Sequence, residues 1–307
     1  MSIAFLYAGQ GSQHPGMGAD LYETYPQFRA VLDGADLDFD VKEVSFQDSQ
    51  GVLNETRYTQ PCMVAFAVGV TQILNHEGIR PDYVAGLSLG EYSALQAAGV
   101  FTPQQAISLV AFRGKVMAEA AKDVPCGMTA VLGLDREKLE QACEQASALG
   151  VVCIANYNCP GQLVIGGHQA AVDEAARLAK EMGARRCMPL KVSGPFHTPL
   201  LKPAGDALAE KFKGETFGEM QVPVLFNCLG REMGPDDTIP ALLERQVQSS
   251  VYMEDTIRRL AELGVDTIVE IGPGKVLSGF VRKTTPEIKT YAVETVADVQ
   301  ALVQALK

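Results

Sequence analysis

The sequence predicts an α/β fold on a mainly parallel sheet, with a small β-α-β-β-α-β segment inserted in it. Short apolar runs alternate with helical patterns through most of the 307 residues, and such alternation is typical of a parallel sheet with crossover helices. From about Gly127 to Val192 the order changes to strand, helix, strand, strand, helix, strand, which is the ferredoxin-like unit. We therefore expect a large domain formed by residues 1–126 and 193–307 and a small subdomain formed by residues 127–192.

The elements of the large domain follow from local patterns. Residues 2–9 predict a buried strand that ends in a glycine-rich loop. An apolar helix is predicted over 59–78, with Thr59 as its N-cap and Gly78 as its stop. A strand at 82–88 then leads into a helix at 89–99. The next helix spans 102–122, with Thr102 as N-cap and Pro103 at its first position. Further elements are predicted at 223–230, 241–248, 253–264 and 265–283, the last as strand, Gly-Pro-Gly turn and helix.

Composition narrows the class of protein. The chain is 47% apolar and 21% charged, which is typical of a globular protein. No apolar run reaches the ~18 residues of a membrane span, and the N-terminus lacks the basic flank of a signal peptide. The net charge of −11 argues against a nucleic-acid partner. Seven cysteines without a C-x-x-C pair predict reduced, mostly buried thiols in a cytoplasmic protein and neither a disulfide framework nor a metal site. Without a candidate span, we expect no membrane partner.

The candidate nucleophile is Ser88, in the pattern G-x-S-x-G between a predicted strand and a predicted helix. Strand, sharp turn and helix are the context of the nucleophile elbow in α/β-hydrolase-like domains. The N–H of Leu89 and the N-terminus of the following helix would then face developing negative charge. The alternative is an ordinary serine in a tight turn, because the five-residue pattern also occurs by chance.

A serine hydroxyl needs a base, and the chain has only four histidines. His197 lies in VSGPFHTPLL, where a glycine and two prolines constrain a loop just after the small segment, and it is the best candidate. His14 follows the first glycine-rich loop, whereas His76 and His168 are more typical of surface positions. The acid expected between serine and histidine in α/β-hydrolases is not recognisable, so another group, such as a backbone carbonyl, would orient the imidazole.

Arg113 and the loop at 9–13 are the other candidate site elements. Arg113 lies on the apolar face of its predicted helix, because its i±3 and i±4 neighbours are Leu109, Val110, Val116 and Met117. Its guanidinium either binds a substrate carboxylate through two parallel hydrogen bonds or forms a buried structural ion pair. The loop after the first strand fits neither a dinucleotide fingerprint nor a P-loop. The backbone N–H of Gln10 in this loop is a candidate second oxyanion donor.

Eight motifs stand in a fixed order along the chain. They are GQGSQ at 9–13, TQP at 59–61, GLSLGEYSAL at 86–95, RG at 113–114, NCPGQLVIGG at 158–167, GPFH at 194–197, Gln246 in LERQVQSS, and EIGPGKVL at 270–277. Together they resemble those of the malonyl-CoA:acyl carrier protein transacylases of fatty acid synthesis and the related acyltransferase domains of polyketide synthases. The resemblance covers nearly the whole chain.

The resemblance implies transfer of a malonyl group from malonyl-CoA to the phosphopantetheine thiol of acyl carrier protein, without a metal or bound cofactor. Ser88 matches the acylated serine and His197 the base. Gln10 and Leu89 match the oxyanion amides, and Arg113 matches the arginine that binds the malonyl carboxylate. The backbone carbonyl of Gln246 matches the group that orients the histidine, and Phe196 matches the malonyl-selective form of its motif.

Two departures and three alternatives accompany this interpretation. Leu87 stands where the family often has histidine, and QSSVYM at 248–253 replaces a common Asn-Pro stretch. A trans-acting polyketide acyltransferase remains an alternative within the family. A serine esterase and a non-catalytic carrier-binding module are alternatives outside it. For carrier docking we expect basic side chains near the site, with candidates Lys191, Lys202, Lys275, Arg282 and Lys283.

Overall fold

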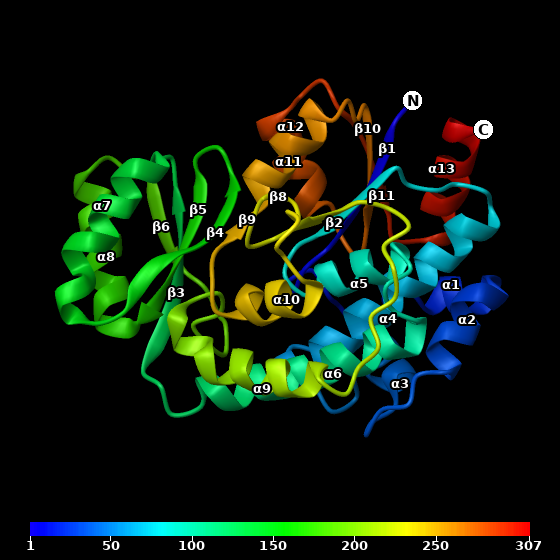
Figure 1. Ribbon diagram of the computed structural model, residues 1–307, viewed down its shortest axis with the longest axis horizontal. Helices are drawn as coiled ribbons and strands as arrows, with labels where there is room; N and C mark the ends of the chain where they lie inside the picture. Colours follow the sequence, from blue (N-terminus) through cyan, green and yellow to red (C-terminus); the bar gives the residue numbers. More distant parts are fainter. The chain divides into compact units, whose positions relative to one another are not determined.

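The computed structural model describes residues 1–307, and internal packing divides them into two compact units (Figure 1). The first unit comprises Met1–Lys115, Phe217–Phe226 and Arg258–Lys307, and the second comprises Val116–Thr216 and Asn227–Ile257. Helices and strands alternate along most of the chain. Every helix is too short or too polar to span a membrane.

The first unit is built on a parallel sheet with strand order β11-β10-β1-β2-β7. These strands are β1 (Ile3–Tyr7), β2 (Tyr83–Gly86), β7 (Val224–Phe226), β10 (Thr267–Ile271) and β11 (Lys289–Val293). All five residues of β1 are buried, as expected for a central strand covered on both faces. The predicted α/β fold with a mainly parallel sheet is therefore confirmed.

Helices account for most of the remaining chain in this unit. They are α1 (Ala19–Thr24), α2 (Pro26–Asp33), α3 (Val41–Phe46), α4 (Thr56–His76), α5 (Gly90–Ala97), α12 (Val276–Thr284) and α13 (Val296–Leu306). Two more, α6 (Pro103–Ala121) and α11 (Met253–Glu262), continue from one unit into the other. Thr102 caps α6 as predicted, because its hydroxyl accepts a hydrogen bond from the N–H of Gln105 at 3.2 Å.

The predicted start of α4 at Thr59 is wrong. The helix begins at Thr56, with Glu55 at the N-cap position. Thr59 is buried in the first turn, where its hydroxyl donates to the carbonyl of Leu53 at 2.5 Å. The loop before α4 packs against this first turn. The hydroxyl of Thr59 therefore bonds to a carbonyl of that loop and does not cap the N–H groups of the helix.

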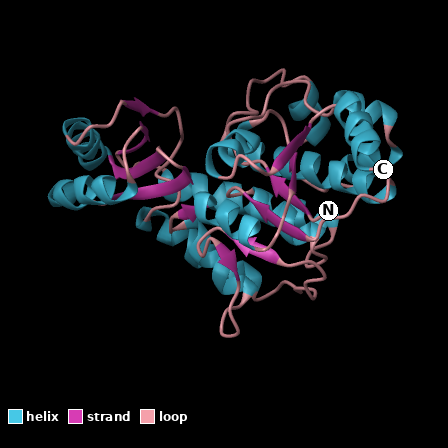
Figure 2. Cartoon of the chain, turned by 90° about the horizontal axis from the view of Figure 1, so that it is seen from above, coloured by secondary structure: helices cyan, strands magenta, loops and turns pink.

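The second unit contains an antiparallel sheet with two helices on one face. Its strands are β3 (Cys126–Leu132), β4 (Val152–Cys159), β5 (Gln162–His168), β6 (Arg186–Pro189) and β9 (Val251–Tyr252), in the order β6-β3-β5-β4-β9. The helices α7 (Arg136–Ala146) and α8 (Gln169–Glu181) lie side by side against this sheet (Figure 2). The segment from β3 to β6 thus has the element order β-α-β-β-α-β.

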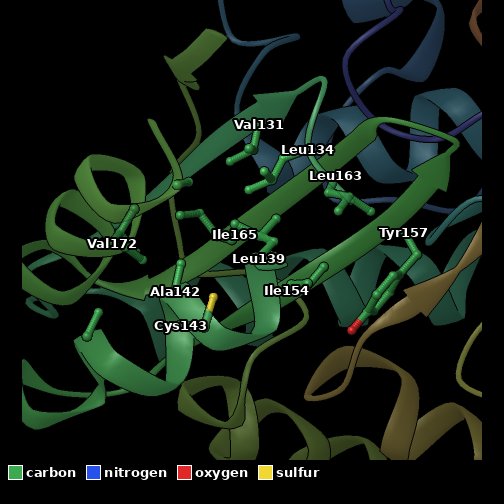
Figure 3. Packing of buried hydrophobic residues seen from close by; sticks show 13 residues of the cluster. Val131, Leu134, Leu139, Ala142, Cys143, Ile154, Tyr157, Leu163, Ile165 and Val172 are labelled. Atoms are coloured by element: carbon green, nitrogen blue, oxygen red, sulfur yellow. The ribbon is translucent and has the colours of Figure 1, made fainter. Parts of the chain in front are cut away.

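One apolar cluster joins these two helices to the sheet. Leu139, Ala142 and Cys143 of α7 point toward Ile154 and Ile165 of the strands (Figure 3). Val172 of α8 closes the other side of the cluster. Its members are fully or almost fully buried, and such burial is the main stabilising term of a small layered unit.

The second unit extends beyond the 127–192 segment expected from the sequence. Strand β9 pairs in parallel with β4, so residues near 251 belong to the same sheet. The unit also includes β8 (Arg231–Glu232), α9 (Lys202–Phe212), α10 (Ile239–Val247) and the short 3₁₀ turns η1 (Ser147–Leu149) and η2 (Pro199–Leu201). Helices α9 and α10 pack against each other. The loop that bears His197 is therefore part of this unit.

Candidate active site

Ser88 occupies a strained turn between β2 and α5. Its φ of 55° is in the left-handed region, which few residues other than glycine adopt and which often marks a functional site. A Cβ on Gly86 would lie 2.1 Å from the carbonyl carbon of Gly90, and a Cβ on Gly90 would lie 2.5 Å from the carbonyl oxygen of Tyr7. Only glycine therefore fits on either side of the serine, and the turn has the geometry of a nucleophile elbow.

The loops after β1 and β2 lie side by side in the first unit. Tyr7 and Gly86 are register partners at the ends of these strands, and Gln10 and Leu89 each follow three residues later. A Cβ on Gly9 would lie 2.8 Å from the carbonyl oxygen of Leu87, so the two loops are in close contact. The backbone N–H groups of Gln10 and Leu89 take no part in the hydrogen bonds of the loops. Two amides are thus available beside Ser88 for an oxyanion.

Arg113 of α6 is completely buried, with 0% of its surface exposed, and lies next to Ser88. Its Nη2 donates to the Oγ of Ser88 at 3.1 Å, and its Nη1 donates to the Oε1 of Gln60 at 2.7 Å. The guanidinium carbon lies 5.7 Å from the ring centre of Tyr92. Burial lowers the pKa of Arg113, whereas Tyr92 and Glu91 favour its charged form. Since a guanidinium stays protonated in proteins, a cation lies against the candidate nucleophile.

His197 belongs to the second unit and is held by the C-terminal end of α10. Its Nδ1 lies 2.9 Å from the carbonyl oxygen of Gln246, and its backbone N–H donates to the carbonyl of Val247 at 3.2 Å. The last carbonyls of a helix have no partner within the helix and carry partial negative charge. Since a carbonyl only accepts, Nδ1 carries the proton and Nε2 presents its lone pair. This is the tautomer that a general base needs.

The loop around His197 is itself constrained. The φ of His197 is 60°, which is again in the left-handed region. Thr198 donates its hydroxyl hydrogen to the carbonyl of Pro195 at 2.6 Å. Phe196 is buried, and its ring lies 3.0 Å from the position that a Cβ on Gly194 would take. The loop and the C-terminal end of α10 thus fix the imidazole.

The other three histidines have contacts of their own. His14 is half exposed and bonds through Nε2 to Glu294 at 2.6 Å, a contact that raises its pKa. His76 is exposed near the end of α4. His168 accepts the N–H of Val151 at 2.9 Å through Nδ1, which ties β5 to the start of β4. None of the three is held by the end of a helix as His197 is.

The departures from the family pattern have simple structural outcomes. Leu87 is half-buried, and its Cγ lies 3.0 Å from the position that a Cβ on Gly9 would take, so it packs on the glycine-rich loop. After Gln246, α10 ends, and Ser250 donates its hydroxyl to the carbonyl of Ile154 at 2.7 Å. The replaced Asn-Pro stretch therefore leaves the carbonyl of Gln246 directed at His197.

Sequence reasoning missed two polar residues of this site, Thr56 and Gln60. Both are buried near the start of α4. Thr56 accepts a hydrogen bond from the side-chain amide of Gln10 at 3.1 Å, and Gln60 accepts from Arg113. Their spacing of four residues was a usable signal, because i and i+4 share a face of a helix and buried polar groups need partners.

A family model described as acyl transferase domain matches residues 4–302. The chain belongs to this acyl transferase family. It is 42% identical to the malonyl CoA-acyl carrier protein transacylase of Bacillus subtilis over 99% of this chain and 97% of the relative. It is 37% identical to the protein of the same name from Staphylococcus aureus (strain MRSA252), over 97% of each chain.

Solved structures of the acyl transferase family agree with this fold. The crystal structure of MCAT from Streptococcus pneumoniae superposes with a TM-score of 0.95 at 46% identity, over 99% of this chain and 100% of that chain. A malonyl-transacylase in complex with its type II PKS acyl-carrier protein gives a TM-score of 0.95 at 37% identity, over 99% and 100% of the two chains. The nucleophile elbow and the buried arginine described above thus belong to an acyl transferase.

Proposed function

We propose that this chain is a malonyl-CoA:acyl carrier protein S-malonyltransferase of fatty acid biosynthesis. One structural observation carries the choice of acyl group: the fully buried guanidinium of Arg113 donates to the hydroxyl of Ser88. A cation beside the nucleophile suits an acyl group that bears a carboxylate. Family membership and the names of the relatives support the same reaction.

The proposed mechanism is a double displacement. The Oγ of Ser88 attacks the malonyl thioester while the Nε2 of His197 takes its proton, and the oxyanion accepts from the amides of Gln10 and Leu89. CoA leaves as a thiol that receives the proton from His197. The phosphopantetheine thiol of acyl carrier protein then attacks the malonyl ester by the reverse route, which regenerates the hydroxyl. Each step moves only an acyl group and a proton, so the proposal includes no metal or cofactor.

Two further assignments belong to this proposal. The carbonyl of Gln246 orients His197 through Nδ1 in place of a carboxylate. Phe196 is the side chain that we assign to selectivity for malonyl over branched acyl groups. A cytoplasmic location is also proposed, in keeping with seven free cysteines.

The direct test is mass spectrometry after mixing the protein with malonyl-CoA in the absence of a carrier. We expect one malonyl adduct, which peptide mapping places on Ser88, and we expect its loss when phosphopantetheinylated acyl carrier protein is added. An adduct on a cysteine would contradict the assignment of the nucleophile. A serine esterase would instead release malonate quickly without an acceptor thiol, and a carrier-binding module would form no adduct.

Arg113→Ala is expected to remove the preference for malonyl. Loss of one partner of a buried charge pair typically costs about 2–5 kcal/mol. At about 1.4 kcal/mol per tenfold, kcat/KM for malonyl-CoA should fall roughly 30- to several thousand-fold. Acetyl-CoA has no carboxylate, so its transfer should be unchanged or faster. Arg113→Lys should recover part of the loss only, because an ammonium cannot form the bidentate fork.

The measurement is kcat/KM for both donors, with thermal unfolding as a control. A purely structural arginine predicts a lower melting temperature and equal losses for malonyl and acetyl transfer. Equal losses would therefore remove Arg113 from substrate binding.

Carrier docking is expected to depend on exposed basic side chains. Lys191 is exposed between Leu190 and Val192, two apolar residues that are themselves 37% and 39% exposed. Arg282 and Lys283 are exposed on α12. Lys191→Glu and Arg282→Glu, made separately, should each raise KM for the acidic carrier about 3- to 10-fold and leave KM for malonyl-CoA within about twofold.

Lys138→Glu on α7 is the matched control, because it makes the same charge change at an exposed lysine that is not among the five docking candidates. The other two candidates, Lys202 and Lys275, are tested in the same way, although Lys202 pairs with Asp206 at 2.5 Å. Equal effects on both substrates would show that a side chain serves CoA or overall charge. The assay should include type II polyketide carriers, since one relative was solved with such a partner.

A further inference from the structure

The C-terminal end of α10 receives hydrogen bonds from two parts of the chain. The last four carbonyls of an α-helix have no i+4 N–H inside the helix, and in α10 these belong to residues 244–247. The first two accept from side chains that follow the helix, Gln248 at 3.4 Å and Ser249 at 2.8 Å. The last two accept from the Nδ1 and the backbone N–H of His197. The position of this helix end therefore decides how well a carbonyl reaches the imidazole.

Ser250 ties this helix end to the antiparallel sheet of the second unit. It directly precedes β9, and its hydroxyl donates to the carbonyl of Ile154 in β4 at 2.7 Å. Strand β4 bulges at this point, because its register against β5 shifts between Ile154 and Asn156. The parallel pairing of β9 with β4 begins one residue later, at Val251. The hydroxyl thus extends the contact between the two strands toward α10.

The loop of His197 packs on the neighbouring strand of the same sheet. Thr198 is completely buried, and its Cγ2 lies 3.1 Å from the position that a Cβ on Gly166 of β5 would take. Gly166 adjoins Ile165, which is the register partner of Ile154. Ile154 and Ile165 belong to the apolar cluster under the sheet (Figure 3). Adjacent points of one packed sheet therefore hold both sides of the hydrogen bond between imidazole and carbonyl.

This hydrogen bond determines the tautomer of the imidazole as well as its orientation. A neutral imidazole carries one proton on either ring nitrogen, and the partner of each nitrogen selects the tautomer. The carbonyl of Gln246 only accepts, so at 2.9 Å it keeps the proton on Nδ1 of His197 and the lone pair on Nε2. Such bonds span only about 2.7–3.2 Å between the heavy atoms. A helix end displaced by about 1 Å would lose this selection.

We propose that Ser250 is a positioning residue for His197: its hydroxyl fixes the end of α10 on β4, so that the carbonyl of Gln246 maintains the tautomer with the proton on Nδ1. The inference rests on the proposed function, in which His197 is the base. It gives a role to the stretch at 248–253, where the chain departs from the family pattern. The tautomer belongs to the resting protein, so it is measurable without turnover.

The first experiment is NMR of the protein labelled with ¹⁵N in its histidine rings, at alkaline pH, where the imidazoles are neutral. The signals of His197 are assigned by their loss in His197→Ala. We expect one tautomer in the wild type, with the proton on Nδ1, and a second population with the proton on Nε2 in Ser250→Ala. His168, whose Nδ1 accepts from the N–H of Val151, should keep its own tautomer in both proteins.

The second experiment is steady-state kinetics of Ser250→Ala. We expect kcat to fall about 5- to 20-fold, with KM within about twofold, because a misplaced base slows the chemical steps. The loss should be equal for malonyl and acetyl donors, since the base serves both. Ser250→Cys, a weak donor of similar size, should show the same loss. Ser250→Thr, which keeps the hydroxyl, should restore most of the rate.

Ser249→Ala is the matched control. It makes the same substitution at the adjacent serine, whose hydroxyl bonds to Arg245 of its own helix and not to the sheet. That bond is exposed, so water can replace it, and we expect the wild-type tautomer and kcat within about twofold. Thermal unfolding shows whether each variant retains its fold.

A double substitution tests whether Ser250 acts through His197. When Ser250→Ala is added to His197→Ala, we expect no further loss in kcat, because no imidazole is left to position. A side chain with a merely structural role would lower the residual rate by its full factor again.

The outcomes separate the inference from the proposed function. A wild-type protein that transfers no malonyl group would overturn both. A wild-type protein that transfers malonyl, with a Ser250→Ala variant that keeps one tautomer or the wild-type kcat, would overturn the inference alone, as would a full additional loss in the His197→Ala background. A second tautomer, with a kcat loss that Ser249→Ala does not share and that disappears without His197, would support it.

Discussion

Ser88→Ala is expected to abolish acyl transfer, with a loss in kcat on the order of 10⁶. The reason is chemical, because the double displacement has no acyl acceptor once the hydroxyl is removed. The backbone of the elbow should remain strained in the variant, because the flanking glycines and the left-handed φ of 55° belong to the turn and not to the hydroxyl. Binding of malonyl-CoA should persist, since Arg113 and the loop amides are unchanged.

The measurement combines steady-state kinetics with intact mass after exposure to malonyl-CoA. Ser93→Ala is the matched control, because Ser93 is a buried serine of the adjacent helix α5. The control should keep both the adduct and most of the rate. Persistence of an adduct in Ser88→Ala, or its loss in Ser93→Ala, would mean that the nucleophile has been wrongly assigned.

His197→Ala is expected to have the second largest effect, a loss of about 10⁴-fold in kcat, at the upper end of general acid–base catalysis. One imidazole acts as base when Ser88 attacks and as acid when CoA leaves, so both half-reactions should slow. Rapid-quench experiments should show a slow formation of the malonyl-enzyme and an equally slow transfer to the carrier thiol. Thermal unfolding is the control, and a modest fall in melting temperature is expected, because the substitution removes a buried side chain that donates to the buried carbonyl of Gln246.

His14→Ala, His76→Ala and His168→Ala serve as controls for this prediction. His14 is half exposed and pairs with the half-buried Glu294, His76 is exposed, and His168 accepts a local backbone N–H. Each should retain activity within about one order of magnitude, as is usual for substitutions outside the reacting groups. If His14→Ala were the most damaging of the four substitutions, the base would lie on the glycine-rich loop.

Several elements were predictable because their signals are local. Thr102 and Pro103 mark the start of α6 through capping and a fixed φ. The glycines at 86 and 90 predicted the sharp turn at Ser88, because a turn this tight leaves no room for a Cβ at either position. The helices α1, α2, α3, α9 and α13 and the strand β11 were not predicted. Helices α1 and α3 have only six residues each, too few to show a helical period.

Other features could not be read from the chain. The cap predicted at Thr59 failed because a neighbouring loop competes for its hydroxyl. The extent of the second unit depends on the pairing of β9 with β4, two strands about ninety residues apart, and such a pairing follows from packing and not from local pattern. The assignments at Phe196 and Gln246 came from resemblance to a family, whereas those at Gln10 and Leu89 came from their loop positions as well. All four stay predictions until they are tested.

The sequence by itself determined the parallel α/β class, the sharp turn at Ser88 and the presence of an arginine within an apolar stripe, because periodicity, glycine spacing and burial of charge leave local traces. Only the tertiary structure decided which groups contact the arginine and how the carbonyl predicted to orient His197 lies against the ring. Arg113 of α6 donates to Gln60 of α4 and to Ser88 in the turn before α5. The Nδ1 of His197 lies against the carbonyl of Gln246, about fifty residues further along the chain. The physical reason is that a buried donor bonds to whichever acceptor lies near it in the folded protein. Local sequence does not show which donors and acceptors are brought together.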